Sequence, residues 1–196
     1  MDKTNFYYKQ NYEAFIDNTF TCDMEEQYNF FFKNLSKEAK TILDLGFGSA
    51  RDMLYFKSRG FEVYGIDVVD EFCRHAQSLG LNNVYNMDVK NMTFTNLFDG
   101  IWACASLLHI EEEDLGLAFL KCYEALKDDG IIYASFKYGT FSGLRNGRYF
   151  TDMTEDKLLN FIDKDLFVVK DMLITSDVRE DRKDEKWLNV ILKKSK

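Results

Sequence analysis

The feature that most constrains the fold is an alternation of short apolar runs with segments of helical spacing. Apolar residues between the runs recur at helical intervals, as in Met53, Leu54 and Phe56 ahead of Gly60. Strands that alternate with helices are joined by crossover connections, which favours a mostly parallel sheet covered on both faces. The predicted strands occupy residues 41–45, 61–66, 83–87, 98–105 and 130–136.

The last third of the chain changes character. A helical pattern at Leu158, Leu159 and Ile162 is followed by two strand-like runs, residues 166–175 and 186–194, which are separated by a highly charged stretch. Such a pair predicts an antiparallel hairpin at the sheet edge. The expected fold is therefore α/β: a doubly wound, seven-stranded, mostly parallel sheet with an antiparallel C-terminal hairpin and helices on both faces.

The first forty residues precede the first strand and predict two helices. One places Tyr8, Tyr12, Phe15 and Thr19 on a common face, and the other aligns Met24, Tyr28, Phe31, Phe32 and Leu35. Core packing explains the second helix well. The first helix could equally form a lid whose tyrosine hydroxyls meet a ligand. We expect a single domain over residues 1–196, with a helical cap (1–40), a cofactor-binding core (41–137) and a substrate loop, helix and hairpin (138–196).

Composition excludes several classes of protein. The net charge of −8 disfavours a long nucleic acid as partner, because such binding relies on Lys and Arg neutralising phosphates. The four cysteines form no C-x-x-C pair, and only two histidines accompany them, so neither a metal site nor a disulfide framework is expected. No apolar run reaches membrane-spanning length, and the N-terminus lacks a signal-peptide core. We expect a cytoplasmic protein in a reducing compartment and no membrane partner.

Residues 41–52, TILDLGFGSARD, place two glycines directly after the first predicted strand. Glycine lets the backbone N–H groups and the following helix N-terminus approach a ligand closely. In a G-x-G-x-x-G pattern the third glycine would fall at Arg51, whereas in G-x-G-x-G it would fall at Ala50, which differs by one methyl group. A left-handed backbone at Ala50 would cost about 1–2 kcal/mol, and a helical one nothing.

With Asp44, this turn resembles motif I (D-x-G-x-G) of the class I S-adenosylmethionine-dependent methyltransferases, and the resemblance runs from about Thr41 to Lys137. Asp67 ends the next strand, 21 residues beyond Gly46, where a carboxylate accepts hydrogen bonds from ribose hydroxyls. That position would equally suit NAD or a helix N-cap. Residues 98–110 and 126–136 match the fourth strand and the entry to the fifth. Phe47 and Ala50 depart from the usual Cys and Gly.

The resemblance implies S-adenosyl-L-methionine as cofactor and a set of binding residues. Met87, Asp88 and Val89 would lie near the adenine, although an aspartate in a loop is common. The nearest types are small-molecule methyltransferases, including the tellurite-resistance and quinone-biosynthesis enzymes. The implied cofactor-binding residues are Tyr8, Asp44, Gly46, Phe47, Gly48, Ser49, Ala50, Arg51, Asp67, Val68, Met87, Asp88, Val89, Cys104 and Ala105.

Methyl transfer needs an acceptor that is aligned and out of water, and a base only when the acceptor carries a proton. His109 is the histidine placed for that role, although a purely structural histidine is an equal alternative. The chain has no proline, which excludes the Asn/Asp-Pro-Pro-aromatic motif of enzymes that methylate base amino groups. Cys104 follows Ala103 rather than proline, so it is interpreted as a small buried residue.

Residues 137–150 join the sheet to the late helix and bring positive charge to an acidic chain. Three glycines predict mobility, and Lys137, Arg145, Arg148 and Tyr149 are candidates for binding a carboxylate or phosphate of the acceptor. An ordinary solvated loop is the alternative. The oligomeric state and the acceptor stay open.

Three functions are compatible with these patterns. An active small-molecule methyltransferase is favoured. A catalytically silent S-adenosylmethionine-binding scaffold or sensor would bind the cofactor without turnover. An NAD-dependent oxidoreductase is disfavoured by Arg51, which stands where its third glycine belongs.

Overall fold

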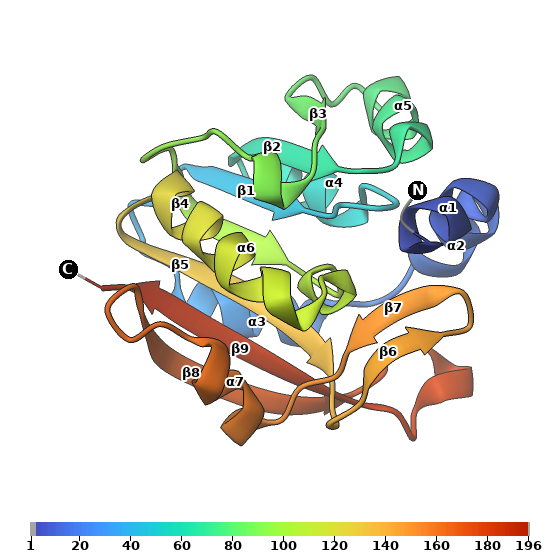
Figure 1. The fold of residues 1–196 in the computed structure, drawn as a ribbon. Helices are drawn as coiled ribbons and strands as arrows, with labels where there is room; N and C mark the ends of the chain where they lie inside the picture. The colour runs from blue at the N-terminus through green and yellow to red at the C-terminus, as the bar shows by residue number, and fades with distance from the viewer. Residues whose placement is uncertain (1–2, 196) are drawn as a thin grey trace.

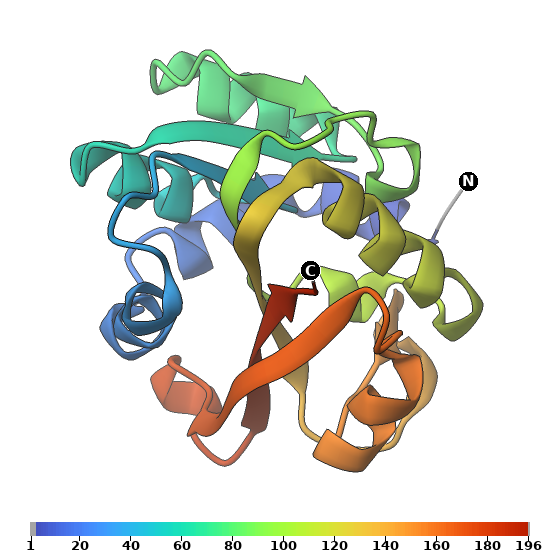
Figure 2. The same ribbon diagram turned by 90° about the vertical axis from the view of Figure 1, so that its left-hand side faces the viewer.

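The computed structural model describes residues 3–195 and contains the expected seven-stranded sheet, in the order β3-β2-β1-β4-β5-β9-β8 (Figures 1 and 2). The five N-terminal strands run parallel, and β9 pairs antiparallel with both β5 and β8. This confirms the predicted fold class. The strands are β1 (Thr41–Leu45), β2 (Glu62–Asp67), β3 (Val84–Asn86), β4 (Phe98–Ala103), β5 (Leu126–Lys137), β8 (Phe167–Ser176) and β9 (Lys186–Lys194).

Two strand ends differ from the prediction by two residues or more. The fourth strand stops at Ala103 rather than at residue 105, because Ala105 adopts a left-handed φ of 51° that turns the chain out of the sheet. The fifth strand begins at Leu126 rather than at residue 130, since Leu126 already pairs with Phe98 across a register shift.

Alternation along the central strands builds two separate cores. Leu43, Ile101 and Ile132 face one core, whereas their neighbours Ile42, Trp102 and Tyr133 face the other. In Figure 1, α6 (Glu112–Ala125) covers the front of the sheet while α3 (Glu25–Asn34) and α4 (Arg51–Ser58) lie behind it. The remaining helices against these cores are α5 (Asp70–Ser78), on the side of α3 and α4, and α7 (Glu155–Phe161), on the side of α6.

The N-terminal segment departs from the expected single first helix. It forms α1 (Lys3–Gln10) and α2 (Tyr12–Thr19), separated at Asn11, whose side-chain amide donates to the Tyr7 carbonyl at 2.8 Å. The helix is interrupted at Asn11, whose φ of −123° and ψ of 18° lie outside the helical range, and this divides the expected common face. Tyr8 and Phe15 line a cavity, whereas the Tyr12 hydroxyl donates to Glu13 and lies outside the cavity lining.

The segment predicted as a mobile loop is a β-hairpin. Strands β6 (Ser142–Arg145) and β7 (Arg148–Thr151) pair around Asn146-Gly147, which have φ values of 51° and 80°. Asn-Gly with two positive φ values is the preferred two-residue hairpin turn, so the sequence carried a signal that the loop prediction missed. The hairpin lies beside α1 (Figure 1), where the Tyr149 amide donates to Thr4 Oγ1 at 2.8 Å.

Three short 3₁₀ turns complete the chain: η1 (Val89–Asn91), η2 (Leu107–His109) and η3 (Glu180–Arg182). None of the helices within residues 3–195 combines the length and apolarity needed to span a membrane.

Two glycine substitutions test the packing of α3 on the sheet. An added Cβ at Gly100 would lie 2.7 Å from Phe31 Cζ, so Gly100→Ala should lower the free energy of unfolding by about 1–3 kcal/mol. Gly116→Ala is the matched control, because its Cβ meets nothing within 4 Å on α6 and alanine favours the helix, which should raise stability by about 0.5–1 kcal/mol. Urea denaturation of both variants measures the difference, and equal effects would contradict this packing.

Candidate functional site

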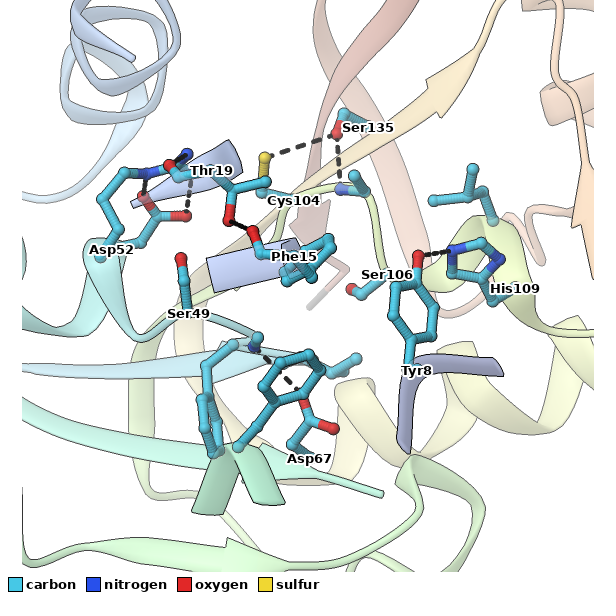
Figure 3. Close-up of a pocket in the computed structure, with 18 of the residues that line it drawn as sticks. Tyr8, Phe15, Thr19, Ser49, Asp52, Asp67, Cys104, Ser106, His109 and Ser135 are labelled. Atoms are coloured by element: carbon cyan, nitrogen blue, oxygen red, sulfur yellow. Dashed lines mark hydrogen bonds and ion pairs between the residues drawn. The ribbon is translucent and has the colours of Figure 1, made fainter. Parts of the chain in front are cut away.

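A cavity of about 280 Å³ lies at the carboxyl ends of the central strands, beneath the N-terminal helices and β7. Ligands in open α/β sheets bind at this edge. Its wall combines the glycine turn after β1, the end of β2, the turns after β3 and β4, and side chains from α1, α2 and β7. Figure 3 shows Asp67 and Ser49 on one side of the cavity and the Tyr8–His109 pair on another.

The glycine turn passes close to two other segments. Gly46 and Gly48 have φ values of 70° and 50°. A Cβ at Gly46 would lie 2.5 Å from Ser106 Cβ, and one at Gly48 would lie 2.7 Å from the Phe15 ring. Ala50 adopts the left-handed conformation, with φ 61°. Its methyl group is fully buried and does not line the cavity.

Asp67 joins the end of β2 to this turn. Its carboxylate accepts hydrogen bonds from the backbone N–H of Gly48 at 3.0 Å and of Val69 at 2.9 Å. Burial raises the pKa of Asp67 to about 6, although these backbone N–H groups lower it in part. Each carboxylate oxygen has a second acceptor site, so the group can still accept from a ligand in the cavity.

Asp44 lies behind the turn rather than in the cavity lining. It is buried, and its Oδ2 atom has no hydrogen-bond partner within residues 3–195. Burial, followed by the negative charge of Asp52, raises the pKa of Asp44 well above its ordinary value. A buried carboxyl oxygen without a partner is costly, and a donor supplied by a bound ligand or water would relieve that cost.

Asp52 is a cavity residue that the sequence analysis missed. It receives a bidentate pair of hydrogen bonds from Arg51 at 2.7 and 2.9 Å, one from Trp102 Nε1 at 2.8 Å and one from the Tyr28 hydroxyl at 2.5 Å. Arg51 also donates to the Thr19 carbonyl at 3.0 Å. Arg51, a predicted cofactor residue, therefore ties α2 to α4. The role of Asp52 could not be predicted from the sequence, because it depends on Tyr28 and Trp102 meeting at its carboxylate.

The other implied cofactor residues fall into two groups around the cavity. Phe47, Ser49, Val68, Met87, Asp88 and Val89 line it, and Asp88 also accepts from the Lys90 amide at 2.8 Å. Cys104 and Ala105 line it after β4, where the Ala105 amide donates to Ser135 Oγ at 2.8 Å. Burial raises the pKa of the Cys104 thiol to about 12, so at neutral pH it is no thiolate nucleophile. Ser106 and Ser135 are further cavity residues that were not predicted.

His109 and Tyr8 meet across the cavity, although 101 residues separate them in the chain. The Tyr8 hydroxyl lies 2.8 Å from His109 Nε2, and His109 Nδ1 lies 2.6 Å from the Tyr149 carbonyl oxygen. Arg148 donates to the Tyr8 hydroxyl at 3.2 Å. Figure 3 shows the Tyr8 ring between Asp67 and His109.

Of the four predicted substrate residues, two line the cavity and two do not. Lys137 and Arg148 line the cavity, whereas Arg145 lies outside the lining and pairs with Asp152 at 2.6 Å. Lys137 forms an ion pair with Glu185. Tyr149 lies outside the lining and contributes its backbone carbonyl to His109. The connection between β8 and β9 adds Asp177, Arg179 and Arg182 to the cavity lining. The sequence analysis treated this stretch only as the charged connection between two strands.

Comparison with known proteins finds one matching family model. A family model described as a methyltransferase domain matches residues 42–130, which span the glycine turn, Asp67 and the turn after β4. No curated protein sequence matches the chain.

Solved structures share the fold along nearly the whole chain. The 1,6-didemethyltoxoflavin-N1-methyltransferase of Burkholderia thailandensis, with its substrate and S-adenosylhomocysteine bound, has a TM-score of 0.79 at 20% identity over 98% of this chain and 87% of that one. The N-methyltransferase NodS of Bradyrhizobium japonicum, in complex with S-adenosylhomocysteine, has a TM-score of 0.70 at 15% identity, covering 96% and 98%. The [4+2]-cyclase SpnF has a TM-score of 0.75 at 15% identity, covering 97% and 95%.

Residues 42–130 thus match a methyltransferase domain, and the chain shares the fold of the solved methyltransferases. S-adenosylmethionine, the cofactor of such methyltransferases, fits the residues present. Gly46 and Gly48 form a turn with no room for side chains, and Asp67 directs a carboxylate into the cavity beside it. The buried Asp44 oxygen behind the turn lacks a donor that a charged amino group could supply, directly or through water.

The raised pKa of Asp67 predicts a pH-dependent cost in stability. Because its folded pKa of about 6 exceeds the unfolded value of 3.8, the folded state binds the proton more tightly, and stability falls as pH rises between these values. The full cost above pH 6 is about 3 kcal/mol. Asp67→Asn has no titrating carboxyl group and removes this pH-dependent cost. Between pH 4 and pH 7 the free energy of unfolding of the wild type should therefore fall by about 3 kcal/mol relative to that of the variant.

Guanidinium denaturation of both proteins across this range measures the difference. The amide can accept only one of the two backbone hydrogen bonds, but that loss is independent of pH and leaves the slope unaffected. Parallel stability curves for wild type and Asp67→Asn would contradict the raised pKa.

Proposed function

We propose that this methyltransferase transfers the methyl group of S-adenosylmethionine to a small-molecule acceptor that binds in the 280 Å³ cavity. One observation carries the proposal: the glycine turn, Asp67 and the polar Tyr8–His109–Arg148 group all face one cavity. The bound cofactor supplies an already electrophilic methyl group. What the chain then has to provide is enclosure, alignment and exclusion of water.

The N-terminal helices supply the enclosure. Phe15 covers Gly48, Arg51 holds the Thr19 carbonyl, and Tyr8 bridges to His109 on the opposite wall. A lid with three separate attachments keeps water away from the reacting atoms and leaves room for a small acceptor rather than a polymer. The finer similarity to tellurite-resistance or quinone-biosynthesis enzymes stays a prediction.

A second function, binding of the cofactor without methyl transfer, is favoured by one observation. A [4+2]-cyclase shares this fold with a TM-score of 0.75, so the fold also serves a protein named for a different reaction. The two candidates differ in turnover and not in cofactor binding.

Arg148 makes an anionic or strongly polarised acceptor group the best fit. Within residues 3–195 it forms no ion pair, its buried Nε has no hydrogen-bond partner, and its guanidinium lies over the rings of Tyr7, Tyr8 and Phe150. Arg145 and Lys137 already have carboxylate partners. We propose Arg148 as the residue that attracts the acceptor.

We also place the protein in a reducing compartment, because its four cysteines are free.

Calorimetric titration with S-adenosylhomocysteine tests the cofactor site. We expect micromolar binding by the wild type, no comparable binding of NAD, and a loss of about 10–100-fold in affinity for Asp67→Ala, since one charge-assisted hydrogen bond contributes about 1.5–3 kcal/mol. Asp70→Ala is the matched control, because Asp70 is an exposed carboxylate on α5. Equal affinities for the Asp67 and Asp70 variants, or preferential NAD binding, would contradict the assignment.

A panel of acceptors tests the role of Arg148. For an acceptor carrying a carboxylate or phosphate, Arg148→Ala should raise KM at least 10-fold, because a charged partner is lost from a partly buried site. Arg74→Ala, an exposed arginine on α5, should leave KM within 2-fold. An unchanged KM for Arg148→Ala would remove the anionic acceptor from the proposal, and cofactor binding without turnover of any acceptor would favour the silent scaffold.

A further inference from the structure

The Tyr8 hydroxyl lies in a polar socket formed by His109 and Arg148. The displacement of the methyl group does not itself require these groups. It stands between His109 Nε2 at 2.8 Å and an Arg148 guanidinium nitrogen at 3.2 Å. Aromatic rings surround it, with Phe15 at 5.3 Å and Phe72 at 6.2 Å between ring centroids. Tyr8 is nevertheless partly exposed, and it lines the cavity.

The hydrogen bonds assign the protons in this socket. The Tyr149 carbonyl can only accept, so His109 Nδ1, 2.6 Å away, carries the hydrogen. In the neutral ring this leaves a lone pair on Nε2, and the Tyr8 hydroxyl donates to it. Arg148 donates to the same phenol oxygen. That oxygen has two lone pairs, so one acceptor position remains for a group in the cavity.

Burial and the nearby Arg148 charge act on the pKa of the Tyr8 hydroxyl in opposite directions. Burial raises the pKa of the Tyr8 phenol above its ordinary value, which keeps it protonated, while Arg148 lowers the pKa in part. Asp67 from β2 and Tyr7 from α1 also act on Tyr8, and both raise its pKa. A phenol next to a guanidinium can accept and release a proton in one event, because developing negative charge on its oxygen is stabilised.

We propose that Tyr8 and His109 form a proton relay that deprotonates the acceptor at its reacting atom, which accordingly belongs to a neutral O–H or N–H group such as that of a phenol, an enol or a ring N–H. A carboxylate or phosphate attracted by Arg148 would lie elsewhere on the same acceptor. This inference rests on the proposed function. The acceptor's proton passes to the Tyr8 oxygen while the Tyr8 proton passes to His109 Nε2. The electron pair of the broken O–H or N–H bond stays on the acceptor atom as nucleophile, and His109 becomes an imidazolium that later returns its proton to solvent.

The relay is assembled by the lid. The Tyr149 backbone binds both partners, because its amide donates to Thr4 on α1 and its carbonyl orients His109. Docking α1 on β7 therefore brings Tyr8 to a histidine that is already oriented. A base that is completed only when the lid is closed removes the acceptor proton where water is excluded.

An ionisable probe tests the relay without turnover. Saturated with S-adenosylhomocysteine, the protein is titrated with 4-nitrophenol, whose ionised form absorbs visible light. The wild type should raise the ionised fraction of the bound probe at least 10-fold above that of free probe at the same slightly acidic pH. Tyr8→Phe and His109→Gln should abolish the increase, while Tyr12→Phe, a tyrosine outside the cavity, should retain it.

Two further measurements separate the possible failures. Nitrogen-15 NMR of the two histidines should show the Nδ1–H tautomer for His109, and Tyr8→Phe should shift its Nε2 resonance. S-adenosylhomocysteine binding is measured for every variant. Loss of that binding in the wild type would overturn the proposed function. A wild type that binds it but fails to bind or ionise the probe, an Nε2–H tautomer, or full ionisation by Tyr8→Phe would overturn the relay alone.

Discussion

The close approach of the backbone at Gly46 and Gly48 is the constraint on which the rest of the site depends. At these two positions the turn after β1 touches Ser106, the residue just before η2, on one side and Phe15 of the lid on the other. Left-handed φ values and missing side chains permit both contacts. The same turn offers the Gly48 amide to Asp67, which fixes the end of β2 beside it. Strand ends, lid and cavity are thus positioned by one short segment.

The lid is held by polar contacts that are distributed over the rim of the cavity. Arg51 binds the Thr19 carbonyl at one end of the N-terminal segment, and Thr4 binds the Tyr149 amide at the other. Between them, Tyr8 reaches His109. Tyr8 and Phe15 also pack on the Phe72 ring of α5, so apolar as well as polar contacts hold the lid.

Much of the architecture was predictable because it depends on local periodicity. The seven strands, their order along the chain and the helices between them follow from apolar spacing, and the glycine turn and Asp67 follow from motif spacing. The loop predicted at residues 137–150 was wrong although its Asn-Gly signal was available. The single first helix was wrong because the backbone of Asn11, with φ −123° and ψ 18°, leaves the helical conformation.

The sequence by itself determined the fold class, the place of the cofactor turn and the carboxylate at the end of β2, since each is encoded within a few neighbouring residues. Only the tertiary structure decided which charged side chains form ion pairs and which face the cavity. Arg145 and Arg148 stand opposite each other in one hairpin, yet Arg145 meets Asp152 and Arg148 meets Tyr8. The Tyr8–His109 pair likewise joins groups 101 residues apart. Such contacts depend on how distant elements dock, which no local spacing records.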